Sequence, residues 1–317
     1  MRLRTDRGIS RTLGWFEGKI VHLTHTDLDA VCCDAIFRRK YGNIFTIFSS
    51  VQDYGAYLEK LTRVRSAADF TLCLSDLGGR ASVVETVARL KQNGWRVEWR
   101  DHHVWDGQVV KTVESVIDYL RVSPEFCACE IVFRDLLEND RVAQEIAELG
   151  RDKDFWINND PRSEILSTAI SDRLSREKIA AKLSQGVFVD HEIEEMYETQ
   201  ISLKKKALSK ALQVSALFDS TAITISNGYS SDVAAMLRSR YHSTTELVLR
   251  TNGRFSIRTV APASNQIAAL FDGGGHPHAA GGNLHFTIPE QIAFRFTSYR
   301  LTKVRKLIET ASKFSQS

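Results

Sequence analysis

The sequence predicts an α/β protein with a parallel sheet in its N-terminal half, and three observations support this class. Short apolar runs alternate with stretches of helical periodicity between residues 19 and 103, which is the pattern of right-handed βαβ units. Polar residues that could bind a ligand directly follow three of these runs, as expected where parallel strands end at one edge of a sheet. The length of 317 residues exceeds one average domain and favours two.

The N-terminal elements are expected in the order strand, helix, strand, helix. Gly94 follows the last of the early helices and ends it as a C-terminal cap. The expected strands are 20–24, 44–48, 70–74 and 95–99, and the expected helices are one through 31–36 and those at 54–64, 81–92, 125–139 and 141–149.

A long charged stretch without proline or glycine, residues 190–217, predicts a helix that links two domains. Its three consecutive lysines, 204–206, fit a solvated helix face better than a phosphate contact. We therefore expect a catalytic domain at 1–189 and a smaller domain with a mixed sheet at 218–317. In the smaller domain Asn252-Gly253 predicts a hairpin; its expected strands are 222–226, 246–250 and 255–260, and its expected helices are 232–241, 265–271 and one at the C-terminus.

The composition is that of a soluble globular protein, with 43% hydrophobic and 26% charged residues. A net charge of +3 lacks the basic excess of proteins that coat long nucleic acids. Five cysteines without a C-x-x-C pattern indicate buried, reduced thiols, although Cys127 and Cys129 have a spacing that could bind a metal. We expect a cytoplasmic protein, because the sequence has neither a secretory signal nor an apolar run of transmembrane length.

Several residues with metal-binding side chains follow the expected strands. Each group has an ordinary explanation when taken alone: an acidic loop, a helix cap or a histidine pair in the core. Their occurrence in order after successive strands favours a metal site instead. Carboxylates mixed with imidazoles, without a thiolate, suit Mn²⁺, Mg²⁺ or Zn²⁺. The residues are His25, Asp27, Asp29, Asp76, Asp101, His102 and His103.

A glycine-rich segment near the C-terminus, 273–275, precedes His276. Glycines allow a loop to bring backbone N–H groups close to an anion, although most such loops are only turns. His276 and Arg258 could add charge-assisted hydrogen bonds to a phosphate. Trp105, which follows the histidine pair, is expected either to pack in the core or to stack on a base.

These segments together resemble the DHH phosphoesterase superfamily, whose name derives from the tripeptide Asp101-His102-His103. The segment 25–30 resembles its first motif, with Ala30 where many members have glycine, and Asp76 matches the aspartate of the second. The segment 152–156 resembles the fourth motif, in which we prefer Asp152 as the ligand, because it lies four residues before the aromatic Trp156, and keep Asp154 as the alternative. Residues 255–258 and 271–282 resemble the signature of the accompanying DHHA1 domain, so the resemblance covers nearly the whole chain.

The resemblance implies a metal-dependent hydrolase with a DHH domain at 1–189 and a substrate-binding DHHA1 domain at 218–317. Two divalent cations are expected, most simply Mn²⁺, with Mg²⁺ or Co²⁺ as alternatives. Their expected ligands are His25, Asp27 and Asp76 for one ion and Asp29, Asp76, His102 and Asp152 for the other. The other expected site residues are His103 on a substrate phosphate with Asp101 beside it, and Arg258, Gly273, Gly274, Gly275 and His276 for substrate binding.

Within this superfamily, the chain most resembles enzymes that cleave short single-stranded oligonucleotides to mononucleotides. The alternatives are a RecJ-like single-strand exonuclease, a cyclic-dinucleotide phosphodiesterase and a phosphatase of 3′-phosphoadenosine 5′-phosphate. An inorganic pyrophosphatase fits less well, because that subfamily has a different C-terminal domain. A non-enzymatic scaffold is disfavoured, because every matched position carries a competent ligand. The resemblance permits a homodimer, and no membrane partner is expected.

Overall fold

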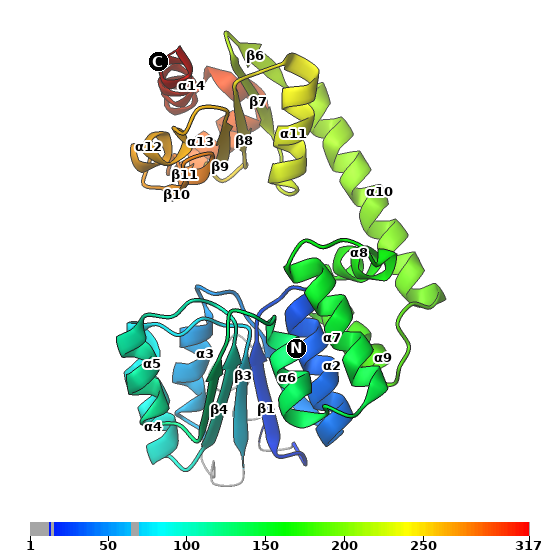
Figure 1. Cartoon of the computed structure of the whole chain (residues 1–317). Helices are drawn as coiled ribbons and strands as arrows, with labels where there is room; N and C mark the ends of the chain where they lie inside the picture. The colour runs from blue at the N-terminus through cyan, green and yellow to red at the C-terminus, as the bar shows by residue number, and fades with distance from the viewer. Residues whose placement is uncertain (1–12, 14–15, 65–69, 317) are drawn as a thin grey trace. The chain divides into compact units, whose positions relative to one another are not determined.

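The computed structural model describes residues 13, 16–64 and 70–316, and it divides into two compact units, Met1–Gln200 and Ile201–Ser317 (Figure 1). Each unit contains its own sheet and its own hydrophobic core. The predicted fold class, an α/β protein with one parallel and one mixed sheet, is confirmed. Among the described residues, no helix is long and apolar enough to cross a membrane.

The sheet of the first unit is parallel throughout, and its strands end level with one another. Its strands are β1 (Ile20–Thr24), β2 (Ile44–Phe48), β3 (Thr71–Ser75), β4 (Arg96–Asp101) and β5 (Tyr119–Val122). They are arranged in the order β2-β1-β3-β4-β5. The register pairs Thr24 with Ser75 and Ser75 with Arg100. The residues that follow β1, β3 and β4 therefore emerge at the same edge, where parallel sheets bind ligands.

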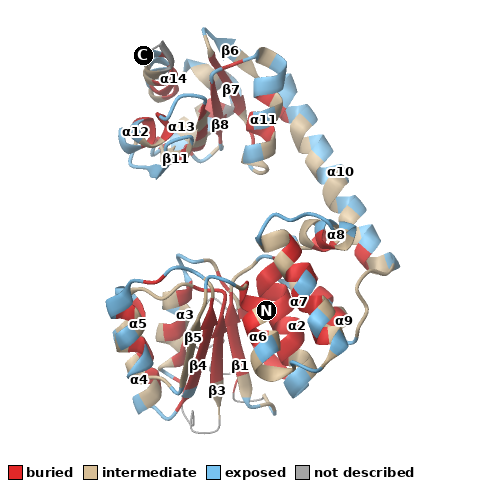
Figure 2. Cartoon of the chain, viewed as in Figure 1, coloured by how far each residue is buried: buried red, intermediate tan, exposed pale blue. Residues whose placement is uncertain are grey.

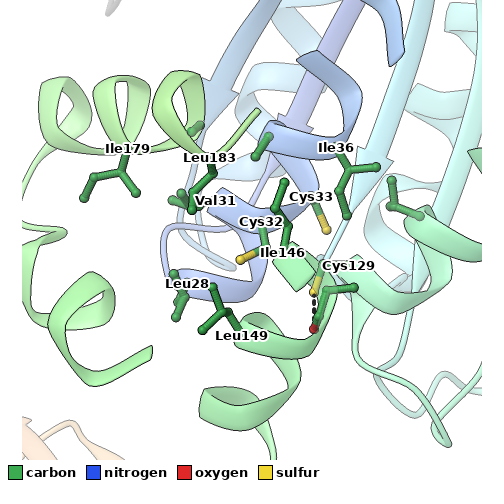
Figure 3. Close-up of a cluster of buried hydrophobic side chains, with 14 of the residues drawn as sticks. Leu28, Val31, Cys32, Cys33, Ile36, Cys129, Ile146, Leu149, Ile179 and Leu183 are labelled. Atoms are coloured by element: carbon green, nitrogen blue, oxygen red, sulfur yellow. Dashed lines mark hydrogen bonds between the residues drawn. The ribbon is translucent and has the colours of Figure 1, made fainter. Parts of the chain in front are cut away.

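Helices cover both faces of this sheet, so its central strands are buried, as Figure 2 shows for β1, β3 and β4. One core lies under α3, α4 and α5, and the other lies under α2, α6, α7, α8 and α9 (Figure 3). Several of these helices begin with an aspartate whose side chain accepts a backbone N–H, the preferred cap. The helices are α2 (Leu28–Tyr41), α3 (Tyr54–Leu61), α4 (Ala81–Gln92), α5 (Gly107–Glu114), α6 (Ala128–Leu136), α7 (Arg141–Asp154), α8 (Pro161–Ala169) and α9 (Arg173–Ser184).

The long helix α10 (His191–Gln213) leads from the first unit into the second. The second unit has strands β6 (Ala216–Phe218), β7 (Thr221–Ile225), β8 (Thr245–Leu249), β9 (Arg254–Thr259), β10 (Gly274–His276) and β11 (Ala279–Asn283). Their order is β10-β11-β9-β8-β7-β6, and the β7–β8 pair is parallel while the other pairs are antiparallel.

The two faces of the second sheet are covered to different extents. One face packs against α12 (Ser264–Ala269), α13 (Ile288–Thr297) and α14 (Thr302–Gln316), which together form the core of the unit. The 3₁₀ turn η2 (Ser298–Arg300) lies between α13 and α14. On the other face, α11 (Ser230–Tyr241) and α10 pack over Ala222 and Val248 on β7 and β8.

Most expected elements are present, with some differences in extent. Strands β1 and β2 and helix α4 have the expected bounds, whereas α7 continues to Asp154, five residues beyond the expected end. The structure adds β5, α5, α8 and α9, which the sequence analysis did not name. It also adds β6, β10 and β11, so the glycine-rich segment expected as a loop forms two short antiparallel strands.

Candidate metal centre

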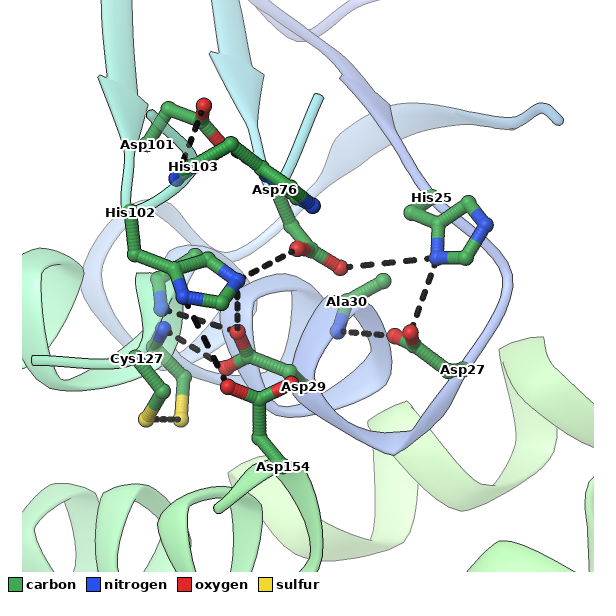
Figure 4. A network of polar contacts seen from close by, with 12 residues as sticks. His25, Asp27, Asp29, Ala30, Asp76, Asp101, His102, His103, Cys127 and Asp154 are labelled. Atoms are coloured by element: carbon green, nitrogen blue, oxygen red, sulfur yellow. Dashed lines mark hydrogen bonds and ion pairs between the residues drawn. The ribbon is translucent and has the colours of Figure 1, made fainter. Parts of the chain in front are cut away.

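His25 and Asp27 follow strand β1 and lie at the start of helix α2 (Figure 4). One oxygen of Asp27 accepts a hydrogen bond from the Ala30 backbone N–H at 3.2 Å, and the other lies 2.8 Å from Nδ1 of His25. Burial of Asp27 opposes its ionisation, but the hydrogen bond and charge of His25 outweigh this effect and lower the pKa of Asp27 to about 2. The carboxylate is thus ionised and partly exposed.

Asp29 lies in the first turn of α2, and its carboxylate is buried against the start of helix α6. Its two oxygens accept hydrogen bonds from the backbone N–H groups of Ala128 and Cys129, each at 2.8 Å. A helix N-terminus stabilises an anion at this position. Burial and the charge of Asp27 nevertheless raise the pKa of Asp29 to about 6. A cation close to this carboxylate would favour its ionised form and lower its pKa again.

Asp76 follows strand β3 directly and lies between His25 and His102 (Figure 4). Its Oδ1 is 3.4 Å from Nε2 of His102, and its Oδ2 is 3.7 Å from Nδ1 of His25. Oδ2 is buried and has no hydrogen-bond partner. The backbone of Asp76 has φ 53°, the left-handed region that costs energy for residues other than glycine. Burial and the neighbouring carboxylates, first Asp29, raise the pKa of Asp76 well above its usual range.

His102 and Asp154 complete the cluster and lie next to Asp29. Nδ1 of His102 is 3.6 Å from Oδ2 of Asp154, and its Nε2 is 3.9 Å from Oδ2 of Asp29. Burial is the largest cause that raises the pKa of Asp154. The structure thus brings together His25, Asp27, Asp29, Asp76, His102 and Asp154.

The structure does not bring Asp152, the preferred fourth-motif ligand, into this cluster. Its carboxylate accepts hydrogen bonds from the backbone N–H of Asn159 at 2.8 Å and from the hydroxyl of Ser163, so it ties the end of α7 to α8. Residues two apart on a helix point to different sides. Asp154 lies one turn after Gly150, and a Cβ at Gly150 would meet the Asp29 carboxylate at 3.5 Å. The phase of the helix therefore directs Asp154, and not Asp152, toward Asp29.

The donor set suits divalent cations. In each of two groups, His25 with Asp27 and Asp76, and Asp29 with His102 and Asp154, one ligand atom from every residue lies within 4.8 Å of the others. Four carboxylates converge with two imidazoles, and the orphaned Oδ2 of Asp76 faces the first group. Oxygen and imidazole ligands of this kind fit Mn²⁺ or Mg²⁺.

Two of the five cysteines, Cys127 and Cys129, lie close to this centre. All five are buried and free of disulfides. Cys127 and Cys129 approach Asp29, with their sulfurs 3.4 Å apart. Burial raises the pKa of Cys127 to about 12. The Cys127 thiol is therefore protonated at neutral pH, and the composition had indicated buried, reduced cysteines.

His103 lies at the exposed side of the cluster and is oriented by Asp101. Oδ1 of the buried Asp101 is 2.9 Å from Nδ1 of His103, and this hydrogen bond raises the pKa of His103. The other oxygen of Asp101 accepts from the Trp105 indole N–H at 2.6 Å. Trp105 packs edge-on against Trp99, with ring centroids 4.7 Å apart, and is only 8% exposed. It belongs to the core, so it is not available to stack on a base.

Behind the cluster lies a buried polar network that sequence analysis missed. Nδ1 of His22 is 2.9 Å from Asp34, and its Nε2 is 2.8 Å from the hydroxyl of Ser75. The same hydroxyl lies 2.9 Å from that of Thr24, so the network joins the ends of β1 and β3 just before His25 and Asp76. The signal for it is a histidine within an otherwise apolar strand, which alone is more typical of a core residue.

In the second unit, Arg258 and His276 share one face of the sheet. Arg258 pairs with Ala279 across β9 and β11, and Ala279 pairs with His276 across β11 and β10. Residues directly opposite in a sheet point to the same side. The glycines allow close approach of the strands, because a Cβ at Gly273 would lie 2.1 Å from the carbonyl oxygen of Gly281. Of Gly273, Gly274 and Gly275, only Gly275 has a positive φ, 140°.

Comparison with known proteins identifies the fold. No protein-family profile and no curated protein sequence matches the chain. Among solved structures, the DHH domain of a protein from a family of ribosomal proteins matches with TM-score 0.55 and 13% identity over 98% of this chain and 89% of that one. RecJ from Thermus thermophilus, in complex with Mn²⁺, matches with TM-score 0.54 and 14% identity over 100% of this chain and 55% of RecJ.

The pGpG-specific phosphodiesterase PggH from Vibrio cholerae matches with TM-score 0.52 and 11% identity, over 92% of this chain and 100% of that protein. At these identities the likeness concerns the fold. The chain has the fold of the DHH-domain proteins, which confirms the architecture that the sequence motifs predicted.

Proposed function

We propose that the chain is a metal-dependent phosphodiesterase that hydrolyses short single-stranded oligonucleotides to mononucleotides, with two divalent cations, most simply Mn²⁺. The observation that carries this proposal is the environment of the Asp76 carboxylate. A buried carboxylate with an unpartnered oxygen, held in a costly backbone conformation between two histidines, is expected where one aspartate serves two cations.

The chain provides two sets of ligands that share Asp76. His25, Asp27 and Asp76 would hold one cation. The other would be held by Asp76 together with Asp29, His102 and Asp154, where Asp154 replaces the Asp152 expected from the sequence. When bound, such a pair of ions lowers the pKa of a water molecule and neutralises phosphoryl oxygens.

The residues around the cations position and neutralise the substrate. His103 is partly exposed, and Asp101 favours its protonated form. Its free Nε2 would donate a hydrogen bond to a phosphate oxygen whose charge grows during attack, the kind of contact that stabilises a transition state. The hydrogen bond to Asp101 fixes the ring, so little reorganisation is needed when the substrate reacts.

Two features support a short substrate. The net charge of +3 provides little general attraction for long strands. A protein with the same fold is a pGpG-specific phosphodiesterase, and pGpG is a dinucleotide. Arg258 and His276, on the sheet of the second unit, would bind nucleotide groups remote from the reacting phosphate. Binding energy of this kind raises the rate of hydrolysis when it helps to position the reacting phosphate.

The test is a metal-dependence assay on a panel of substrates. The full chain is treated with a chelator, reloaded with Mn²⁺, Mg²⁺ or Co²⁺, and assayed on a dinucleotide, a pentanucleotide, a long single strand, a cyclic dinucleotide and 3′-phosphoadenosine 5′-phosphate. We expect no activity in the chelator and the highest kcat/KM on the dinucleotide to pentanucleotide range after reloading. Activity that survives chelation contradicts the metal centre, and a preference for the long strand favours a RecJ-like exonuclease.

A further inference from the structure

The face of the second sheet that α11 covers at β7 and β8 is exposed at Arg254, and we call it the open face. It carries a second group of arginines beyond Arg258. Successive residues of a strand point to opposite faces. Arg254, Ser256 and Arg258 therefore share one face of β9, and their burial alternates with that of Phe255 and Ile257, which point into the core. The face that presents Arg258 thus continues along the strand to Arg254.

Arg250 lies directly opposite Arg254 at the closed end of the β8–β9 hairpin. The backbone N–H of Arg250 donates to the carbonyl of Arg254 at 2.7 Å, one pair beyond Leu249 and Phe255. The two guanidinium groups are therefore on the same face. Like charges directly opposite each other in an antiparallel pair are destabilising. An anion bound between the two guanidinium groups would offset this repulsion.

Among the described residues, no hydrogen-bond or ion-pair partner of either guanidinium is present. The neighbouring arginines differ in this respect. Arg258 donates to the Ser231 hydroxyl at 3.0 Å, and Arg238 is paired with the buried Glu246. The arginines next to α11 are therefore anchored or neutralised within the protein, whereas the guanidinium groups of Arg250 and Arg254 are exposed to solvent.

A hollow of about 410 Å³ lies beside these two arginines, lined also by Ser256, Gly281 and Asn283. Gly281 has no side chain to fill this hollow, and a larger residue would not fit there, because a Cβ at this position would lie 2.9 Å from the carbonyl oxygen of Phe255. The Ser256 hydroxyl and the Asn283 amide can add hydrogen bonds to an anion. The acidic group at the rim, Asp272, is 81% exposed and lies 3.1 Å from Nε2 of His285.

This hollow is distinct from the one at Arg258. A second hollow of about 410 Å³ is lined by Arg258, Arg238, Ser231 and His278. Arg254 and Arg258 are four residues apart, which corresponds to about 13 Å along a strand. One phosphate group cannot bridge that distance. The two hollows therefore suit two separate phosphate groups on one strand.

We propose that Arg250 and Arg254 form a second phosphate subsite, which binds a backbone phosphate of an oligonucleotide that Arg258 does not reach. The ligand class of this subsite, an oligonucleotide, rests on the proposed function. The subsite extends that function, because binding would then depend on the number of phosphates in the substrate. Guanidinium groups suit this role since their planar forks match phosphate oxygens.

The test is equilibrium binding of a fluorescently labelled pentanucleotide to the full chain in a chelator, which prevents hydrolysis. Fluorescence anisotropy is measured over a series of salt concentrations for wild type, R250Q/R254Q and the control R305Q/K306Q. The control removes the same charge from the exposed side of α14. Each phosphate contact on a single strand contributes about 0.7 to the slope of log Kd against log salt, so loss of two contacts lowers it by about 1.4.

We expect R250Q/R254Q to show that smaller slope and roughly tenfold weaker binding at low salt, while the control follows wild type. A melting temperature at or above that of wild type checks that the variant folds, since the substitutions remove a repulsive pair. An unchanged slope, or an equal change in the control, overturns the subsite. An equal loss of mononucleotide binding also overturns it, because a single phosphate would then suffice.

The outcome is distinguishable from a failure of the proposed function. The binding measurement needs no turnover. If the arginine variant changes the slope but no substrate is hydrolysed with any metal, the phosphate subsite stands and the phosphodiesterase proposal fails. If oligonucleotides are hydrolysed but the slope is unchanged, the reverse holds.

Discussion

The carboxyl edge of the parallel sheet and the open face of the mixed sheet present opposite kinds of polar surface. At the first, Asp29 and Asp76 are 1% and 2% exposed, and their pKa values are raised by burial and by neighbouring carboxylates. At the second, Arg254, Gly274 and His276 are exposed to solvent. Water and salt screen the exposed charges of the mixed sheet, so each of them contributes little to binding or stability by itself. Buried charges need a specific partner, and their loss has large effects.

The sharpest test of this contrast is Asp76→Asn. The substitution keeps the size of the side chain, and asparagine tolerates the left-handed backbone of this position. It removes a charge that the proposed site shares between two cations, so we expect kcat/KM to fall by more than about 100-fold, beyond the loss typical of residues that only support a ligand. The measurement is Mn²⁺-dependent hydrolysis of a dinucleotide, together with Mn²⁺ affinity by calorimetry.

A matched control is Asp106→Asn. Asp106 caps helix α5 with hydrogen bonds to the backbone of Gln108 and Val109, and asparagine caps a helix about equally well. We expect wild-type activity from this variant. Wild-type turnover in Asp76→Asn would contradict a shared ligand and, with it, the contrast between the two regions.

The next largest effect distinguishes the two aspartates at the end of α7. Asp154→Asn is expected to lower Mn²⁺ affinity and kcat together by about 10–100-fold or more. Asp152→Asn should mainly lower the melting temperature, because it weakens the hydrogen bonds to Asn159 and Ser163 that join α7 to α8. Thermal denaturation and metal titration of both variants check the ranking. If Asp152→Asn loses the metal and Asp154→Asn does not, the placement of Asp154 in the site is wrong.

The succession of strands and helices along the chain and the polar residues that directly follow the strands were predictable from the sequence, because both depend on local patterns. Apolar runs with a polar residue at their end identify β1 and β3, and parallel pairing then brings the residues after them together. The strands β10 and β11 were not predictable in the same way. Glycine is depleted in strands, so the segment 273–282 has the composition of a loop, and its pairing depends on close approach to β9.

The candidate site was predictable to the extent that its residues closely follow a strand. The choice between Asp152 and Asp154 was not, because it depends on the rotation of α7 relative to α2. The spacing from Trp156 favoured Asp152, whereas the contact of Gly150 with Asp29 shows that this side of α7, which also carries Asp154, faces Asp29. The network of His22, Asp34 and Ser75 joins three elements that are distant in sequence, so no single segment reveals it.

The buried carboxylates also predict how stability depends on pH without metal. The pKa of Asp29 is raised to about 6 and that of Asp76 is raised well above its usual range, so the folded chain retains protons that the unfolded chain has lost. Stability therefore falls as pH rises from about 4, the usual aspartate pKa, through about 6. The buried His22, whose pKa is lowered by burial, contributes in the opposite direction. The informative quantity is thus the difference in stability between wild type and Asp76→Asn at each pH.

Melting temperatures in a chelator across this pH range measure that difference. We expect the wild type to lose stability relative to Asp76→Asn as pH rises, and added Mn²⁺ to restore it in wild type only. Parallel curves for the two proteins would mean that Asp76 is already neutralised by groups of the protein, and no cation would then be needed at this position.

The smallest expected effect belongs to the exposed face. His276→Ala removes one exposed hydrogen bond to a phosphate, worth about 1 kcal/mol, or about fivefold in kcat/KM on a pentanucleotide. Bis-p-nitrophenyl phosphate has no nucleotide group remote from the reacting phosphate for His276 to bind, so its hydrolysis should change much less. The control is His191→Ala, because His191 is 86% exposed at the start of α10 and far in sequence from both sets of site residues. Equal losses on both substrates would assign His276 to the fold or to the metals, and the division of work between the two regions would fail.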